Sequence, residues 1–122
     1  MPDVVLTHVR WEAGMAGMFA PLADGKVDDW RSWVAELNGP RKAGFEDMNS
    51  RHELTEHRAY LQPMPDGSSA VLVIYEGPGA DTFLSAVMAS DHEFDQWFVT
   101  NVAELHGMDS SGPMPLMAQR MI

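Results

Sequence analysis

Two histidines are the residues of this chain best suited to move a proton. His57 lies in the alternating segment 54–62, on the same side as Ala59 and Leu61, which we expect to face the helices. An imidazole in an apolar cavity is the usual requirement for proton transfer near neutral pH. His92 lies in the first turn of the last predicted helix, where the helix dipole favours a neutral ring. Both are candidate catalytic residues; the alternatives are a core histidine bonded to the backbone and an exposed surface side chain, respectively.

Aromatic side chains could line a pocket for a flat ligand, because flat rings stack on flat rings. We take Tyr75, Phe94 and Trp97 as candidate substrate-binding residues, although aromatics at regular spacing also form ordinary cores. Asn101 falls seven residues after Phe94, inside the same apolar stripe. A buried amide needs hydrogen-bond partners, so Asn101 either pins a neighbouring backbone group or binds a ligand.

The sequence contains no motif typical of a metal or cofactor site. His52 and His57 resemble the two histidines of a zinc-protease helix, but that motif places them four residues apart so that both share one helix face, and here they are five apart. The absence of cysteine excludes thiolate nucleophiles, iron–sulfur clusters and cysteine-zinc sites. No nucleophilic serine motif or phosphate-binding glycine loop is present. We therefore expect no metal and no cofactor.

The charge of the chain excludes several classes of partner. Eight Lys and Arg against eighteen Asp and Glu give a formal charge of −10 over 122 residues. Such a chain repels phosphate backbones and anionic lipid surfaces, so we expect no nucleic acid and no membrane partner. The N-terminus lacks a positively charged region, and the apolar run 4–6 is too short for a signal peptide or a membrane span. We expect a cytoplasmic protein.

Hydrophobic periodicity predicts alternating strands and helices after an N-terminal arm or extra strand, residues 1–13. Residues 14–20 read as a strand ending at Pro21, and 24–37 as a helix whose apolar positions share one face. A second helical segment runs to about Ser50. Residues 54–62 and 70–75 form a hairpin, and the unbroken apolar run of the second strand predicts a central position covered on both faces.

The C-terminal third predicts two further helices and a strand. A short helix follows Gly79, and Ser90 with Glu93 matches a capping box at the start of the last helix, which ends at Gly107. Residues 114–121 could supply a last strand. The resulting order, βαββαβ over residues 14–122, predicts a ferredoxin-like α+β domain with a four-stranded antiparallel sheet and helices on one face.

The other face of such a sheet needs a cover. A bare face rich in Val, Ile and Tyr would be a large exposed apolar patch, and the commonest solution is a symmetric partner. We therefore expect a homodimer, in which Glu56 and Arg58 on the outer side of residues 54–62 can pair across the twofold axis.

This order of elements and two groups of residues in the first and last helices resemble the dimeric α/β-barrel superfamily. That superfamily includes antibiotic-biosynthesis monooxygenase-type proteins, small polyketide cyclases, muconolactone-type isomerases and stress-responsive barrel proteins. The resemblance implies a ligand cleft between the sheet and the helices of each protomer. The first strand lacks the asparagine of the haem-degrading branch. The residues that carry the resemblance are Pro21, Gly25, Lys26, Trp30, Trp33, Glu36, Leu37, Ser90, Asp91, Phe94, Asp95, Trp97 and Phe98.

Two functional hypotheses follow. The first is a small-molecule-binding dimeric α/β-barrel protein acting as a cofactor-independent monooxygenase, cyclase or isomerase, in which the cleft orients an apolar, aromatic or polyketide-like substrate and His57 or His92 moves a proton. The second is a non-catalytic binding or dimeric assembly module. A cavity large enough for a ring system, with polar groups converging on it beside His57 or Asn101, would favour the first.

Overall fold

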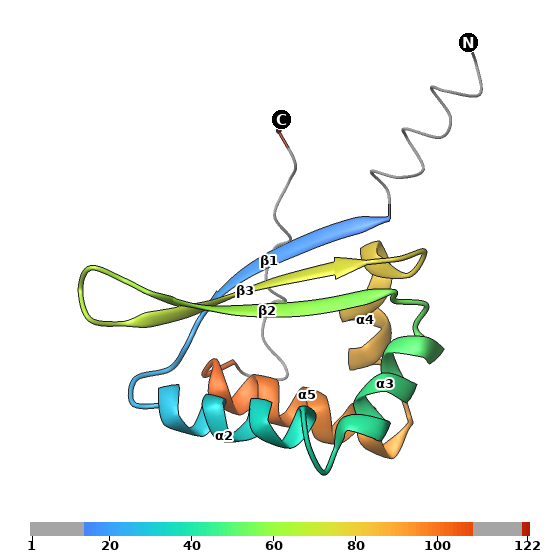
Figure 1. Ribbon diagram of the computed structural model, residues 1–122, viewed down its shortest axis with the longest axis horizontal. Helices are drawn as coiled ribbons and strands as arrows, with labels where there is room; N and C mark the ends of the chain where they lie inside the picture. The colour runs from blue at the N-terminus through green and yellow to red at the C-terminus, as the bar shows by residue number, and fades with distance from the viewer. Residues whose placement is uncertain (1–13, 109–120) are drawn as a thin grey trace.

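The computed structural model describes residues 14–108 and 121–122, which form a mixed α+β fold (Figure 1). The N-terminal segment 1–13 lies outside the described residues, as does the predicted final strand except for Met121, which has no regular structure. The elements in chain order are β1 (Met15–Pro21), α2 (Val27–Leu37), α3 (Lys42–Arg51), β2 (Glu56–Pro63), β3 (Ser69–Glu76), the 3₁₀ helix η1 (Ala80–Thr82), α4 (Phe83–Met88) and α5 (Glu93–Leu105).

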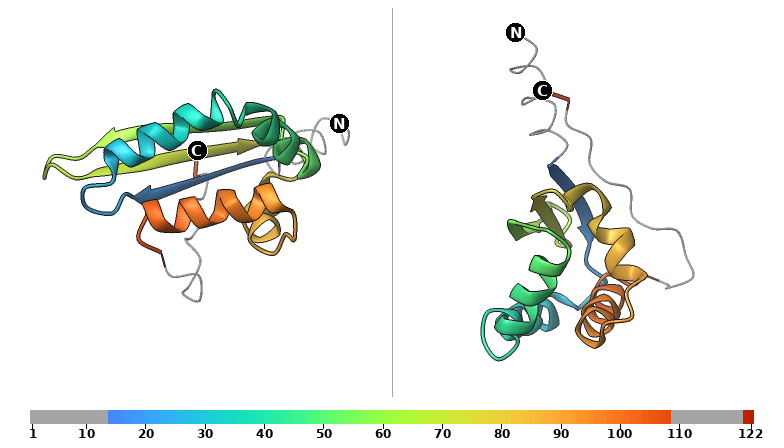
Figure 2. Two further views of the ribbon diagram at one scale, coloured as in Figure 1. Left: turned by 90° about the horizontal axis from the view of Figure 1, so that it is seen from below. Right: turned by 90° about the vertical axis from the view of Figure 1, so that its right-hand side faces the viewer.

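The three described strands form one antiparallel sheet in the order β1-β3-β2. Because β3 is antiparallel to both neighbours, β1 and β2 run parallel with β3 inserted between them, which is the split arrangement predicted from the order of elements. Helices α2 and α5 lie side by side on one face of the sheet, with α3 and α4 at one end (Figures 1 and 2). The α+β class is therefore confirmed, and the described residues are compatible with a ferredoxin-like fold.

Strand β3 is central, as predicted, but its two faces differ. Val71, Val73 and Tyr75 point toward the helices and are buried, because alternate side chains of a strand point to opposite faces. Leu72, between them, is 37% exposed. In a single chain the described helices cover only the inner face of this strand, and cover of the outer face stays a prediction. The apolar run reflects a helix-covered inner face and an apolar outer face.

The outer face carries a row of apolar side chains across all three described strands. Phe19 of β1 and Tyr60 of β2 are both paired in register with Leu72 of β3. Phe19 and Tyr60 are each 47% exposed. Beside this row, Arg58 Nη2 lies 3.3 Å from Glu76 Oε2 within the same chain.

Helix α5 begins differently from the prediction. Its N-cap is His92, whose Nδ1 accepts a hydrogen bond of 3.2 Å from the backbone N–H of Phe94. Ser90 was expected to be this cap, but its hydroxyl accepts from the backbone N–H of His92 and donates to Asp95 at 2.7 Å. The capping-box prediction is therefore wrong, because Ser90 belongs to a side-chain network that joins two helices.

Asp95 is the centre of that network and is fully buried. Arg51, at the end of α3, donates to both carboxylate oxygens of Asp95, with distances of 2.7 and 3.0 Å. His52 Nε2 lies 2.8 Å from Asp95 Oδ2 and Ser90 supplies a third partner. Burial opposes ionisation, but the hydrogen bonds from Arg51, His52 and Ser90 outweigh it and hold the pKa of Asp95 below its ordinary value. We call Arg51, His52, Ser90 and Asp95 the Asp95 cluster; it fixes the start of α5 against the end of α3.

Within the described ranges, no helix has the length and apolar character needed to cross a membrane.

Candidate functional site

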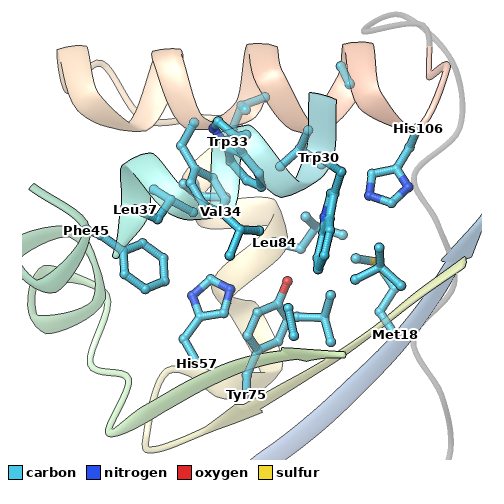
Figure 3. Close-up of a pocket in the computed structure, with 18 of the residues that line it drawn as sticks. Met18, Trp30, Trp33, Val34, Leu37, Phe45, His57, Tyr75, Leu84 and His106 are labelled. Atoms are coloured by element: carbon cyan, nitrogen blue, oxygen red, sulfur yellow. The ribbon is translucent and has the colours of Figure 1, made fainter. Parts of the chain in front are cut away.

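A cavity of about 250 Å³ lies between the inner face of the sheet and helices α2, α4 and α5 (Figure 3). Its walls are largely apolar, and five aromatic rings contribute to them. Cavities for small ligands are usually built in this way, with a few polar groups that set orientation. The aromatic lining residues are Trp30, Trp33, Phe45, Tyr75 and Phe98.

His57 lines this cavity from the inner face of β2, the side predicted from the alternation of residues 54–62. Its Nδ1 lies 2.9 Å from Oδ1 of Asn49. Because an amide oxygen only accepts hydrogen bonds, Nδ1 carries the proton and Nε2 keeps a free lone pair. Burial lowers the pKa of His57 to about 4. The imidazole is therefore neutral at physiological pH and presents a hydrogen-bond acceptor.

Tyr75 lies directly opposite His57 in the register of β2 and β3, with ring centroids 4.9 Å apart. Its hydroxyl points into the cavity (Figure 3). Burial raises the pKa of Tyr75, so the phenol keeps its proton. Among the described residues, no group forms a hydrogen bond with this hydroxyl. Tyr75 therefore offers a free donor beside the acceptor of His57.

His106 also lines the cavity, and the sequence did not identify it. It is the C-cap of α5, and its Nδ1 lies 2.7 Å from the carbonyl oxygen of Pro21 at the end of β1. Burial lowers the pKa of His106, against the opposing effect of the Pro21 carbonyl. Neither apolar periodicity nor a motif pointed to His106, since its position depends on a contact with a residue 85 positions away.

The second candidate catalytic residue, His92, is outside the cavity. Its side chain is 45% exposed at the start of α5, with Nε2 4.0 Å from Asp47 and Nδ1 4.0 Å from Asp95. The cap hydrogen bond with Phe94 occupies Nδ1. The structure therefore does not bring His92 together with His57, and it has the exposed position that we gave as its alternative.

The remaining candidate binding residues on α5 also lie away from the cavity wall. Phe94 and Trp97 pack against each other with ring centroids 5.4 Å apart, and the guanidinium of Arg41 lies 4.4 Å from the Trp97 ring centroid. The amide of Asn101 donates to the Trp97 carbonyl oxygen at 2.8 Å, one of the two roles expected for it. The side of α5 that faces the cavity is instead formed by Phe98 and Val102 with their neighbours.

The described residues that line the cavity carry no formal charge. None of the described residues that line it is Lys, Arg, Asp or Glu. Among the described residues, no group of three His, Cys, Asp or Glu side chains is placed so that it could hold a metal ion. Burying an unpaired carboxylate or phosphate against these described side chains would be costly.

Comparison with known proteins does not assign this chain to a family. The chain matches no protein-family profile, and no curated protein matches it significantly.

Proposed function

We propose that this chain is a small-molecule-binding protein of dimeric α/β-barrel type whose cavity takes an uncharged aromatic or polyketide-like molecule. The observation that carries the proposal is the polar pair formed by His57 and Tyr75 in a cavity whose other described lining residues are mostly apolar and include four aromatic side chains, Trp30, Trp33, Phe45 and Phe98. A hydroxylated ring can donate to Nε2 of His57 and accept from the hydroxyl of Tyr75, while its faces contact the surrounding aromatics.

The same pair suits a proton-transfer step of a cofactor-independent isomerase or cyclase. A C–H or O–H bond of the substrate breaks, the proton moves to Nε2 of His57, and the electron pair stays on a substrate oxygen that accepts a hydrogen bond from Tyr75. Asn49 keeps its hydrogen bond to Nδ1 and so holds the ring in one orientation. A monooxygenase on this site would also take dioxygen as co-substrate.

The alternative, a non-catalytic binding or assembly module, is favoured by one observation. With a pKa of about 4, His57 is a weak base at neutral pH. General bases work best when their pKa lies near the working pH, so His57 can deprotonate only an acidic substrate. In a binding module the same neutral ring serves simply as a hydrogen-bond acceptor.

Binding and turnover of hydroxylated aromatics separate these functions. We would titrate the protein with a naphthol and a hydroxylated anthracene, following quenching of Trp30 and Trp33, which line the cavity. His57→Phe should weaken binding about three- to tenfold through loss of one hydrogen bond, and the matched control His92→Ala should leave it unchanged. Mass spectrometry of the recovered compound then distinguishes an enzyme from a binding module.

Two results would count against the proposal. Equal binding by wild type and by Val73→Phe, which places a ring inside the cavity, would show that the ligand binds elsewhere. Equal effects of His57→Phe and His92→Ala would remove the role given to His57.

We propose further that two copies of the chain pair through the outer face of the sheet. The supporting observation is the exposed row of Phe19, Leu72 and Tyr60. A twofold axis through Leu72 would place Phe19 of one protomer beside Tyr60 of the other, so the row is complementary to itself. Arg58 pairs with Glu76 within the chain and lies at the rim of this row, where it is also available to a partner's carboxylates.

Sedimentation at micromolar concentration tests this pairing. The wild type should sediment as a dimer, and Leu72→Glu should give a monomer because it places a charge at the centre of the buried patch. Ala86→Glu, on the exposed side of α4, is the control and should remain dimeric. A monomeric wild type would refute the pairing and would leave the proposal about the cavity unaffected.

A further inference from the structure

Two histidines reach the same cavity from different elements and are held in the same way. His57 donates from Nδ1 to Oδ1 of Asn49 at 2.9 Å, and His106 donates from Nδ1 to the carbonyl oxygen of Pro21 at 2.7 Å. Each ring therefore keeps an unprotonated Nε2 that accepts hydrogen bonds. Figure 3 shows the two rings on opposite sides of the cavity; in that view the hydroxyl of Tyr75 is on the His57 side, and the Trp30 ring stands between this hydroxyl and His106.

The position of His106 is set by the junction of β1 and α5. Helix α5 ends at Leu105, whose carbonyl oxygen accepts from the backbone N–H of Ala23 at 2.9 Å. Gly107 then adopts a φ of 64°, the left-handed conformation that ends many helices and that glycine adopts without strain. Backbone and side-chain bonds thus join the end of α5 to the segment after β1, and this holds the His106 ring at the cavity wall.

An acceptor at each end of an uncharged cavity defines the ligand that fits it. Donors on the ligand must face His57 and His106, and no lining residue among those described carries a charge that would bind an ionised group. We propose that His106 is a second ligand-binding residue, and that the ligand is an uncharged flat molecule with a hydrogen-bond donor, a hydroxyl or N–H, at each end. This inference rests on the proposed function, because it names the substrate class of the same cavity.

The test compares two probes that differ in one hydroxyl. A naphthol has a single donor, whereas a naphthalenediol with one hydroxyl on each ring has donors at both ends. Tryptophan quenching measures both dissociation constants. The diol should bind the wild type about three- to tenfold more tightly than the naphthol, the gain expected from one added hydrogen bond.

His106→Asn is the decisive variant, because its amide N–H₂ replaces Nδ1–H as the donor to Pro21, whereas its amide oxygen lies near the position of Cδ2 and does not reach that of Nε2. The naphthol keeps its donor to His57, so the variant should weaken binding of the diol more than that of the naphthol, and the advantage of the diol should disappear. A role limited to holding the Pro21 carbonyl would leave the diol's advantage intact, so that outcome overturns the inference. The melting temperature of the variant shows whether the fold is retained.

A second measurement uses the wild type alone. The imidazole ¹⁵N resonance of Nε2 in His106 should shift when the diol is added and stay in place with the naphthol. If the naphthol binds but the diol shows no preference and no shift, the inference fails while the proposed function stands. If neither compound binds, the proposed function fails and the inference fails with it.

Discussion

Replacing Asp95 by asparagine should produce one of the largest losses of stability available to a single isosteric substitution in this chain. Asp95 is 0% exposed and receives two hydrogen bonds from Arg51, with one each from His52 and Ser90. Asn keeps the size but removes the charge and turns one acceptor into a donor that faces other donors. Removing the charge of one partner of a buried ion pair lowers the free energy of unfolding by about 3–5 kcal/mol.

The lower end of that range applies, because the side chain of Arg51 is 31% exposed and water can solvate part of its charge. We expect a loss of about 3 kcal/mol, a large share of the roughly 5–15 kcal/mol that stabilises a domain. Urea unfolding at pH 7, followed by far-UV circular dichroism, should lower the midpoint by about 1.5–2 M at a slope of about 1.5–2 kcal/mol per M.

Asp47→Asn is the matched control, since Asp47 also binds Arg51, at 2.8 Å from Nε, but is 56% exposed. Exposed pairs contribute about 0–1 kcal/mol, so this variant should stay close to the wild type. Because the pKa of Asp95 is held below 3.8, its charge stabilises the fold fully above pH 3.8 and progressively less as the pH falls further. Equal losses in the two variants, or a loss below about 1 kcal/mol for Asp95→Asn, would refute the reasoning.

Three further predictions concern the cavity and one turn. The pKa of His57 lies near 4 in the fold and near 6.5 in the unfolded chain, so stability should be complete above pH 6.5 and decline as the pH falls toward 4. His57→Phe should flatten this decline in urea midpoints measured between those values. Gly77 has a φ of 125°, and an added Cβ would lie 2.5 Å from the carbonyl oxygen of Glu53. Gly77→Ala should therefore lower the melting temperature far more than Gly67→Ala, whose Cβ meets nothing within 4 Å. Val73→Phe should abolish naphthol binding, because Val73 lines the cavity and the larger ring would occupy it; since Val73 is also a buried core residue, the melting temperature should fall modestly.

The hairpin and the face of β2 were predictable because they depend on local alternation. With a period of two, placing Leu61 inward also places His57 inward, and β2 and β3 pair as the turn chemistry between them indicates. The start of α5 was not predictable in this way. Ser90 has the sequence context of a cap, but Asp95 and Arg51, 44 residues apart, recruit its hydroxyl into the Asp95 cluster.

As at the start of α5, local sequence patterns predict some features of the cavity, and contacts between distant residues decide the others. The apolar stripe of α5 correctly predicted a buried face, but it is wider than the cavity, so Trp97 falls on a part that packs against Trp33 and Arg41. The roles of Asn49 and His106 were not predictable from the sequence, because they come from hydrogen bonds to other elements. Hydrophobic periodicity predicts which face of an element a side chain occupies, but it does not predict which residue of another element the side chain contacts.

The size of the cavity makes these distant contacts matter. Across a space of about 250 Å³ the facing side chains of α5 have fewer packing partners, so the helix depends more on contacts at its ends. The Asp95 cluster fixes the start of α5, and the hydrogen bond from His106 to the Pro21 carbonyl oxygen fixes its end. The helix lies over the cavity between these two points. Because the Asp95 cluster lies outside the cavity wall, weakening it should lower stability while leaving the preference for a two-ended donor ligand unchanged.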